Sequence, residues 1–490
     1  MNMKKIFFVI SFCISIFSIA QTSAQWENIY GGPGNEYGYR VRTCLDQGYV
    51  VAGSTSSSGI SDGYLVRVDS LGLVMWYKYY AGNNVDIFRS IKQLPDSGYI
   101  IAGYSNSTGT HGGYDGWVMR TDKNGDSLWS KYIGTSDWDF FYDVATTSDS
   151  GFILAGGTYG AGMGEEDMYF VKLDSLGNIL WTKTYGGAKT EEARCIIETG
   201  DSMLAAVGFT YSLEDSLGDS WILRMNNVGD TIWTRTMNLP LVADKAFGIA
   251  DCYTYNRLYI VGQTAATGND DAYIQCINYS AASIYTVTMG AASHDDFYGI
   301  CVRQDGTLGA VGTTFSYGLN GNMYFFKDRT AWVYHTFGTV EEDGGYSIDF
   351  TKDYGYIACG YTYGYNSNYG HPNLYLVKID STGFSSGVLN IREYKSTSEF
   401  MASTVFPNPI QSNATFTFDT RTSIEGKLHM TIYDISGRNV MNIPESQWVF
   451  NSRNFASCKI QLEALIKGIY TYDIFDDSGG RTSGKFVISN

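Results

Sequence analysis

A short apolar run that ends in glycine recurs along this chain at intervals of about fifty residues. The clearest copies, at 48–53, 98–103 and 151–156, read GYVVAG, GYIIAG and GFILAG. Weaker copies end at Gly208, Gly262 and Gly312, and a clear one ends at Gly360. The final glycines are separated by 50, 53, 52, 54, 50 and 48 residues. A period of this size indicates that one supersecondary unit is repeated in a stacked or radial array.

Each repeat resolves into four short segments with the composition of β-strands. In the first repeat they cover 36–41, 48–53, 62–69 and 74–79, and each is rich in Val, Ile, Tyr or Trp and bounded by turn residues. No stretch shows a sustained helical period. Four antiparallel strands per unit are typical of a propeller blade. The sequence therefore predicts an all-β fold with a seven-bladed β-propeller over residues 25–383.

The two ends of the array predict how the propeller closes. A tryptophan strand follows the third segment of the earlier repeats, but none follows the last third segment, 373–380. An unpartnered tryptophan strand, 26–30, opens the chain after its leader. We expect this N-terminal strand to pair with 373–380, because the pairing would remove two open sheet edges. The recurring aromatic residues of the third and fourth segments are interpreted as packing residues between blades.

The N-terminus and the charge balance indicate an exported protein. Lys4 and Lys5 precede an apolar run that is followed by small residues, which predicts a signal peptide over 1–24; the alternative is an uncleaved anchor. No other segment approaches the length of a membrane span. The formal net charge is -16, which argues against nucleic acid as a partner. The seven cysteines after the leader form no regular disulfide or metal pattern, although one isolated disulfide stays open.

One acidic position recurs in every repeat and is the candidate ligand site. If the tryptophan strand is outermost, these acids begin the innermost strands and encircle one mouth of the central channel. They could bind a cation such as calcium or a polar ligand, or each could accept backbone hydrogen bonds in its own turn. The set is Glu36, Asp86, Asp139, Glu192, Asp244, Asp295 and Asp343.

Variable loops precede each third strand, and strand alternation places them on the same face as the acids. Loops on a rigid scaffold commonly carry binding, so this face is the predicted contact surface. Tyrosines in and beside these loops could stack on sugars or contact a protein: Tyr159, Tyr211, Tyr317, Tyr363, Tyr365 and Tyr369.

The sequence contains no motif that predicts a catalytic residue or a metal ligand set. It has no G-x-S-x-G elbow, no H-E-x-x-H and no P-loop, and its five histidines share no repeat position. A glycosidase-type pair of carboxylates stays open, because acids are plentiful and such pairs are spatial. The leading hypothesis is a non-catalytic binding or adhesion module. The alternatives are a polysaccharide hydrolase or lyase and a purely structural surface protein.

The repeat ends after Gly383, and a different domain follows a polar linker over 384–402. Alternating segments near 414–419, 427–433, 459–462, 469–475 and 485–488 predict a small immunoglobulin-like β-sandwich over 403–490. Four ordered sequence words occur there: FPNP at 406–409, IYDISGR at 432–438, KGIY at 467–470 and GKFVI at 484–488. The residues of these words that we single out are Pro407, Asn408, Pro409, Asp434, Gly437, Gly468 and Tyr470.

These words resemble the type A C-terminal sorting domain of the type IX secretion system of Bacteroidetes. The resemblance implies that the machinery of that system is a partner, and that the protein crosses the outer membrane to be released or displayed on the cell surface. It also implies that the domain is commonly cleaved and its cargo often attached to lipopolysaccharide. The repeat region is similar to propellers of secreted Bacteroidetes proteins. An extracellular glycan or protein is the expected ligand.

Overall fold

The computed structural model describes residues 25–385 and 401–488, apart from short interruptions. The interruptions are 33, 108, 110, 214–216, 238–241, 267, 318–319, 329–331, 365–369, 407–412, 421–426, 435–437, 453–454, 463–464 and 477–480. The chain divides into two compact units, Met1–Arg392 and Glu393–Asn490. The predicted signal peptide and most of the predicted linker lie outside the described residues. Both units are built from strands, and the described residues contain no helix beyond the 3-10 turns Tyr253–Tyr255 and Glu445–Gln447.

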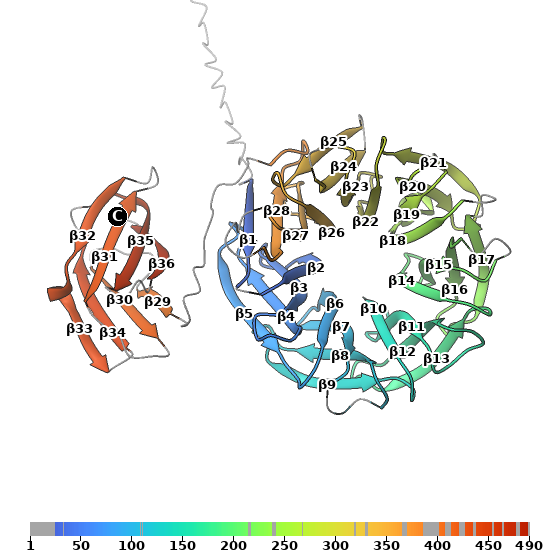
Figure 1. The fold of residues 1–490 in the computed structure, drawn as a ribbon, viewed down its shortest axis with the longest axis horizontal. Helices are drawn as coiled ribbons and strands as arrows, with labels where there is room; N and C mark the ends of the chain where they lie inside the picture. The colour runs from blue at the N-terminus through green and yellow to red at the C-terminus, as the bar shows by residue number, and fades with distance from the viewer. Residues whose placement is uncertain are drawn as a thin grey trace, which may run out of the picture. The chain divides into compact units, whose positions relative to one another are not determined.

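The N-terminal unit consists of four-stranded antiparallel sheets arranged like the blades of a propeller (Figure 1). The described residues of this unit form seven such sheets, and one strand of each lies nearest the centre. These innermost strands are β2 (Glu36–Thr43), β6 (Asp86–Gln93), β10 (Asp139–Thr146), β14 (Glu191–Glu198), β18 (Asp244–Cys252), β22 (Asp295–Val302) and β26 (Asp343–Phe350). The second strands carry the glycine-ended repeat and are β3 (Tyr49–Thr55), β7 (Tyr99–Ser105), β11 (Phe152–Thr158), β15 (Leu204–Thr210), β19 (Arg257–Thr264), β23 (Leu308–Thr314) and β27 (Tyr356–Thr362).

The third and fourth strands complete each sheet toward the periphery. The third strands are β4 (Asp62–Val68), β8 (Asp115–Thr121), β12 (Asp167–Leu173), β16 (Asp219–Met225), β20 (Asp271–Asn278), β24 (Asn322–Asp328) and β28 (Asn373–Ile379). The fourth strands are β5 (Val74–Tyr80), β9 (Ser127–Ile133), β13 (Ile179–Tyr185), β17 (Thr231–Met237), β21 (Ser283–Met289) and β25 (Val333–Phe337), and β1 (Trp26–Tyr30) takes this place beside β28. The pairing of β1 with β28 joins Trp26 to Lys378 and Tyr30 to Leu374, as the sequence predicts.

Packing between neighbouring sheets forms the core. Second and third strands are buried on both faces along most of their length, as β3 and β4 are, whereas most residues of the fourth strands are exposed or half-buried, as in β5. Phe88 of one sheet stacks on Trp117 of the same sheet at 4.5 Å between ring centroids, and its cluster includes residues of the preceding sheet. Large rings remove much apolar area from water, which stabilises stacked sheets. The interpretation of the third-strand aromatics as packing residues is confirmed, because six of the seven are buried: Tyr64, Trp117, Tyr169, Tyr273, Tyr324 and Tyr375.

One main-chain hydrogen bond recurs between successive sheets. The first N–H of each innermost strand donates to the carbonyl of the residue just before the third strand of the preceding sheet, at 2.7–3.1 Å. The bond therefore holds the loops before the third strands beside the starts of the innermost strands. We call the face that carries both the ligand face. The seven pairs are Glu36 with Pro372, Asp86 with Ser61, Asp139 with Tyr114, Glu191 with Glu166, Asp244 with Gly218, Asp295 with Asp270, and Asp343 with Gly321.

The C-terminal unit contains two four-stranded antiparallel sheets, in the orders β29-β30-β34-β33 and β32-β31-β35-β36. Phe416, Ile432, Tyr472 and Phe486 are buried in its core. The strands are β29 (Met401–Phe406), β30 (Asn413–Thr420), β31 (Leu428–Asp434), β32 (Asn439–Ile443), β33 (Trp448–Ser452), β34 (Phe455–Gln461), β35 (Gly468–Asp476) and β36 (Arg481–Ile488). The five predicted segments are all strands, and β29, β32 and β33 are additional.

Candidate ligand-binding channel

The recurring acids lie at the first position of each innermost strand. Strand register identifies them, because each pairs with the last Thr or Ser of its second strand, as Asp139 does with Thr158. In the fourth sheet this position belongs to Glu191, which pairs with Thr210, whereas Glu192 pairs with Phe209. The assignment of Glu192 to the recurring position was therefore one residue out of register. The seven residues are Glu36, Asp86, Asp139, Glu191, Asp244, Asp295 and Asp343, and each is at most 1% exposed.

The contacts of these carboxylates close the loops that lead into the innermost strands. Glu191 accepts the N–H of Gly187 at 2.6 Å and the hydroxyl of Thr210 at 2.8 Å. Asp86 accepts the N–H of Gly82 at 2.7 Å and the hydroxyl of Ser107 at 2.8 Å. Short acidic side chains commonly cap turns in this way. The geometry thus favours turn capping over ligand contact for the recurring acids.

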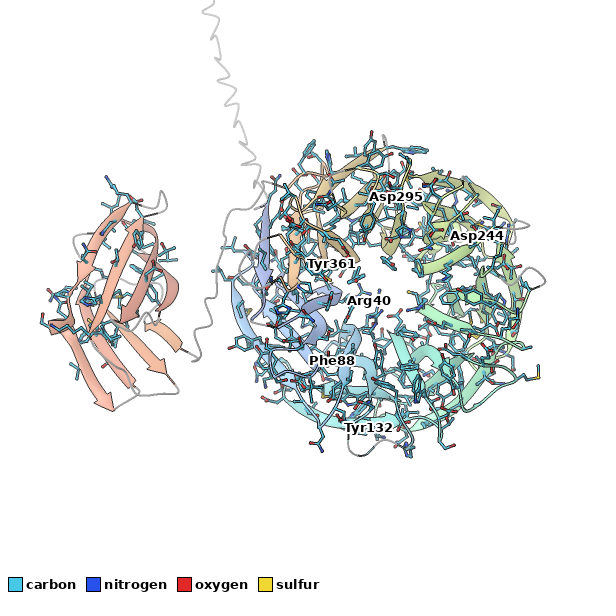
Figure 2. The ribbon with its side chains drawn as sticks, viewed as in Figure 1. Arg40, Phe88, Tyr132, Asp244, Asp295 and Tyr361 are labelled. Carbon is cyan, nitrogen blue, oxygen red and sulfur yellow. The ribbon has the colours of Figure 1, made fainter. Side chains whose placement is uncertain are left out.

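The residues three positions after the acids form a ring in the centre of the sheets. Each innermost strand carries a register shift at this point, so the residue there is the extra residue of a β-bulge. We call this set the collar: Tyr39, Arg89, Tyr142, Arg194, Phe247, Tyr298 and Tyr346. Figure 2 shows the adjoining Arg40 near the centre of the ring of sheets, whereas Phe88 lies farther out and Tyr132 at the periphery.

Collar residues contact one another from sheet to sheet. The Arg89 guanidinium lies 4.1 Å from the ring centroid of Tyr39 and 5.7 Å from that of Tyr142. Arg194 lies 4.5 Å from the Tyr142 ring. Aromatic contacts continue the ring at 4.7–5.5 Å between centroids: Phe247 with Tyr298, Tyr298 with Tyr346, and Tyr346 with Tyr39. Cation–π contacts hold the two guanidinium planes against ring faces.

The two collar arginines differ in how their charge is balanced. Arg194 forms an ion pair of 2.6 Å with Glu192. Arg89 has no ion pair with a carboxylate among the residues that the structure describes. Its charge faces only aromatic rings, which leaves its donors available to a ligand in the channel.

Aromatic side chains cover part of the ligand face next to the collar. Tyr104, Tyr114, Trp138, Phe140 and Tyr159 form edge-on and tilted contacts at 5.0–6.4 Å, and we call them the mouth cluster. Phe140 also stacks on the collar residue Tyr142 at 6.2 Å. Trp138 is 48% exposed and Tyr159 is 39% exposed, so rings of this cluster reach solvent. Such rings offer the flat apolar faces on which sugars stack.

Two glutamates lie beside the mouth cluster. Glu166 is 3% exposed and interacts with Tyr159 and with the charge of Glu192. Burial and the nearby Glu192 charge raise the pKa of Glu166 well above its usual range. Glu192 keeps its ion pair with Arg194. The two carboxylates therefore have different environments, since Glu166 is buried beside Tyr159 and Glu192 is paired with Arg194.

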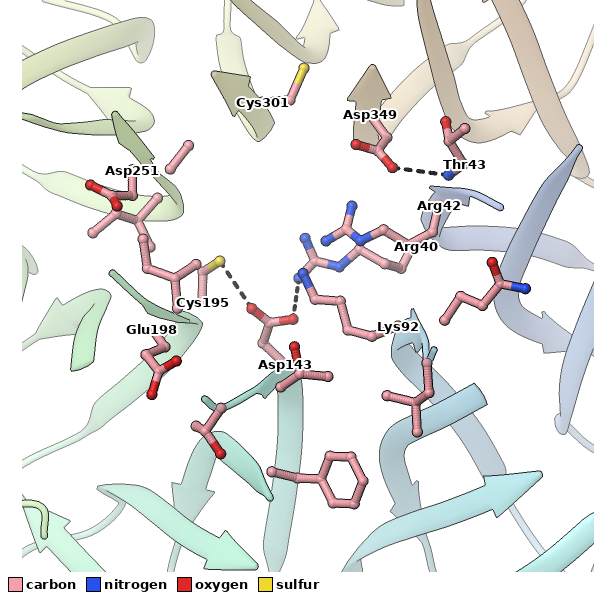
Figure 3. Close-up of a pocket in the computed structure, with 18 of the residues that line it drawn as sticks. Arg40, Arg42, Thr43, Lys92, Asp143, Cys195, Glu198, Asp251, Cys301 and Asp349 are labelled. Atoms are coloured by element: carbon pink, nitrogen blue, oxygen red, sulfur yellow. Dashed lines mark hydrogen bonds and ion pairs between the residues drawn. The ribbon is translucent and has the colours of Figure 1, made fainter. Parts of the chain in front are cut away.

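A cavity of about 1180 Å³ opens toward the carboxyl-terminal ends of the innermost strands (Figure 3). Arg40, Arg42 and Lys92 project into it from the adjacent strands β2 and β6, and we call them the cation cluster. Asp143 accepts a hydrogen bond of 2.8 Å from Arg40 and one of 2.6 Å from Ser90. Burial alone would raise the pKa of Asp143, but the Arg40 and Lys92 charges lower it below its usual range.

No described group of three or more His, Cys, Asp or Glu side chains has the arrangement of a metal site. Among the described residues, the recurring acids therefore do not have the geometry of a calcium site. All seven described cysteines are buried and free. Of the predicted contact tyrosines, Tyr365 and Tyr369 lie outside the described residues.

The sorting words fall on β31, β35 and the loops near them. Asp434 accepts hydrogen bonds of 3.1 Å from the Arg438 N–H and from the Arg438 side chain. Gly468 pairs with Ile488, and the Tyr470 hydroxyl donates to the Ile466 carbonyl at 2.8 Å. Pro407, Asn408, Pro409 and Gly437 lie outside the described residues.

The collar and the cation cluster were not predicted from the sequence. Their signal is present once the repeats are aligned on the acids, because the third position after the acid is aromatic or Arg in all seven. Alternation alone does not reveal it, since a bulge breaks the two-residue period at this residue.

Solved structures with detectable similarity cover most of the chain at low identity. Sqt1 from Chaetomium thermophilum is 12% identical, covers 69% of this chain and 82% of its own, and has a TM-score of 0.42. Puromycin hydrolase is 10% identical over 78% of this chain and 58% of its own, with a TM-score of 0.47. A protein of unknown function from Dyadobacter fermentans is 11% identical over 72% of this chain and 97% of its own, with a TM-score of 0.42. No curated protein matches the chain.

The C-terminal unit has a specific family match. Residues 404–489 match the family described as the secretion system C-terminal sorting domain. The match covers the sequence words noted above and the strands from β30 to β36. Among the described residues, no helix is long and apolar enough to cross a membrane. The chain thus ends in a C-terminal sorting domain of the type IX secretion system, which directs export to the cell surface or the medium.

Proposed function

We propose that residues 25–383 form a closed seven-bladed β-propeller, followed by a linker over 384–402 and an immunoglobulin-like sorting domain over 403–490. Three contacts support closure. β1 pairs with β28, the Glu36 N–H donates to Pro372 like its six counterparts, and Trp26 lies against the turn glycine Gly72. The signal peptide over 1–24 and an origin in Bacteroidetes belong to the same proposal.

The propeller serves as a non-catalytic module that binds an extracellular glycan on the ligand face. The collar provides half-buried rings and the mouth cluster adds the exposed rings of Trp138 and Tyr159, and aromatic faces with polar groups nearby are the usual means of sugar recognition. Because the rings pack on one another, their positions are set before a ligand arrives, which lowers the entropic cost of binding. The acidic surface repels anionic chains in general, so recognition depends on local positive groups.

Arg89 is the observation that carries this proposal. Its guanidinium lies between the rings of Tyr39 and Tyr142 and has no carboxylate partner among the described residues. A planar guanidinium pairs with a carboxylate through two parallel hydrogen bonds. The expected ligand is therefore a glycan that contains uronic acid residues.

A glycan array followed by calorimetry on the purified mature protein tests the proposal. We expect binding to uronic-acid oligosaccharides without turnover and much weaker binding to neutral ones. Arg89→Gln should weaken binding at least tenfold, and Trp138→Ala should weaken it about as much, because a charge-assisted pair and a stacked ring are each lost. Trp332→Ala is the matched control, since Trp332 is 59% exposed on another part of the propeller. If no glycan on the array binds, a protein ligand or a structural role is favoured.

A polysaccharide hydrolase or lyase is the second candidate, and one observation favours it. Glu166 and Glu192 are neighbouring carboxylates: burial and the Glu192 charge raise the pKa of Glu166, and Glu192 is paired with Arg194, which suits a general acid beside an ion-paired carboxylate. Release of new reducing ends or unsaturated products, abolished by Glu192→Gln, would establish this activity. Binding without product would exclude it for the glycans tested.

The sorting domain makes the export route directly testable. Deleting residues 404–489 should leave the protein inside the cell envelope, and fusing 393–490 to a periplasmic reporter should carry the reporter out. A strain that lacks the type IX machinery provides the control for both proteins. Export of the truncated protein at the wild-type level would contradict the assigned role of the domain.

A further inference from the structure

The cation cluster concentrates positive charge in a protein whose formal net charge is -16. Arg40, Arg42 and Lys92 all line the cavity, and all come from two adjacent innermost strands. They lie past the collar, toward the carboxyl-terminal ends of those strands, and none of the seven collar residues lines the cavity. This cavity is thus separate from the ligand face.

Apart from Asp143, the carboxylates that line the cavity have partners outside the cation cluster, and Asp96 pairs with Arg120. Asp349 accepts a hydrogen bond from the Thr43 N–H at 2.9 Å. Glu198 accepts one from the Ser148 N–H at 2.7 Å, and Asp251 accepts one from the Tyr279 hydroxyl at 2.6 Å. None of the three forms an ion pair with the cation cluster among the described residues. Asp143 pairs with Arg40 through one carboxylate oxygen, and its other oxygen accepts a hydrogen bond from the Ile196 N–H at 3.0 Å.

Asp143 therefore balances one of the three positive charges, and two stay uncompensated. Burial and the neighbouring Arg42 charge lower the pKa of Lys92 to about 8, and the Asp143 charge offsets this only in part. Arg42 donates to the Val41 carbonyl at 3.0 Å, which supplies no charge.

Donor atoms in the cluster also lack acceptors. The Nε atoms of Arg40 and Arg42 are buried and have no hydrogen-bond partner among the described residues. Lys92 likewise forms no ion pair and no hydrogen bond with its side chain among the described residues. Buried donors without acceptors are rare in folded proteins, and a bound ion or water is a common reason for them.

We propose that the cation cluster is an oxyanion-binding site, which takes a phosphate, sulfate or carboxylate group between Arg40, Arg42 and Lys92. Oxyanions supply several acceptors at once, and guanidinium groups match them with paired donors. The large cavity admits the group either as a free ion or as the terminus of a larger molecule. Asp143 positions Arg40, and Arg42 and Lys92 provide the net charge that attracts the anion.

Calorimetric titration of the mature protein tests the proposal at constant ionic strength. One arm uses inorganic phosphate and sulfate, and the other uses glucose 6-phosphate, with chloride as the reference salt. We expect one site per chain, and the arm that binds more tightly identifies the source of the group. Arg42→Gln and Lys92→Gln should each weaken binding at least tenfold, while Lys183→Gln should leave it unchanged. Lys183 is the matched control because it lies in the outer strand β13 and pairs with Asp230 at 3.0 Å.

A second measurement protects the test against variants that fail to fold. In the wild-type protein with isotopically methylated lysines, the bound anion should raise the pKa of Lys92 and leave other lysines unchanged. No binding in either arm above the chloride reference overturns the proposal, and so do variants with wild-type affinity. These outcomes are independent of glycan binding at the collar, because the two sites share no residue.

Discussion

At the scale of single residues, an ion pair between a buried cation and a partly exposed aspartate recurs within the sheets. A basic side chain of the third strand reaches the aspartate in the hairpin between the first two strands, and the cation is at most 9% exposed. The hairpin thereby gains a tether that crosses its own sheet. The pairs are Arg67 with Asp46, Arg120 with Asp96, Lys172 with Asp149, Arg224 with Asp201, and Lys378 with Asp353.

Replacing Arg224 tests the contribution of this tether. Arg224 donates to both oxygens of Asp201 at 2.6 and 2.7 Å and to the Thr199 hydroxyl at 2.7 Å. Arg224→Met should lower the free energy of unfolding by about 2–3 kcal/mol, below the full cost of breaking a buried pair because Asp201 can rehydrate. Urea denaturation measures the change. The exposed pair of Lys183 and Asp230 is the control, and Lys183→Met should have no measurable effect.

Glu166 should make stability depend on pH. Its pKa is raised by burial and by the Glu192 charge, so its stabilising effect is complete below its unfolded pKa and is lost as pH rises through the folded value. Glu166→Gln removes the charge that must be buried at high pH, and should stabilise the protein by about 1–2 kcal/mol at pH 9. At pH 4 the two proteins should unfold at the same temperature. A stabilisation that is equal at both pH values would contradict this account.

The recurring acid of the fourth sheet is one place where the sequence alone does not identify the right residue. Glu191 and Glu192 are adjacent, and both fit an acid near the start of a strand. Only the pairing of Glu191 with Thr210 decides between them, because a one-residue slip moves a side chain to the other face. The tethers from third-strand cations were missed for a related reason, since their partners lie 21 to 25 residues apart in the chain.

At the scale of elements, the tryptophan strand of one sheet packs on a turn of the next. The turn between the third and fourth strands contains a glycine with positive φ, and a Cβ there would meet the tryptophan ring at about 3 Å. Trp181 also donates from its indole N–H to the Asn227 carbonyl in the next turn at 3.2 Å. The contact explains why the turn and the tryptophan recur together. The four pairs are Trp26 with Gly72, Trp76 with Gly125, Trp129 with Gly177, and Trp181 with Gly229.

Two glycine substitutions separate backbone strain from this packing. Gly177 has φ +77° and lies under Trp129, whereas Gly268 has φ +102° and no atom within 4 Å of an added Cβ. Gly268→Ala should cost about 1 kcal/mol, the price of a left-handed residue. Gly177→Ala should cost about 2 kcal/mol or more, because the methyl group also displaces the ring. Equal losses in thermal or urea unfolding would show that the ring moves away freely.

Strand number and order could be predicted because turn residues and alternating apolar residues recur in each repeat. The collar could not, because it depends on a bulge that adds one residue to each innermost strand. A bulge changes which side chains face the channel without changing composition. Tyr39 and Arg89 therefore read as ordinary strand residues in the sequence, although the structure brings them within 4.1 Å.

At the scale of the whole N-terminal unit, the sheets separate two chemical environments along one channel. The ligand face presents rings and the collar, and the far end presents the cation cluster in a cavity of about 1180 Å³. Both depend on the innermost strands keeping their positions around the axis. Both proposed sites therefore depend on the proposed closure of the ring, in which β1 pairs with β28.

Replacing Trp26 measures that closure. Trp26 is 4% exposed and donates from its indole N–H to the Ser70 carbonyl of the first sheet at 3.3 Å. If β1 acts as the fourth strand of the last sheet, Trp26→Ala should destabilise the propeller by about 3 kcal/mol, like Trp181→Ala at an interior junction. Trp332→Ala, at a ring that is 59% exposed, should change stability little. An effect of Trp26→Ala as small as that control would mean that the first and last sheets part in solution. Anion and glycan binding, measured on the same variant, would then show whether either site needs the closed ring.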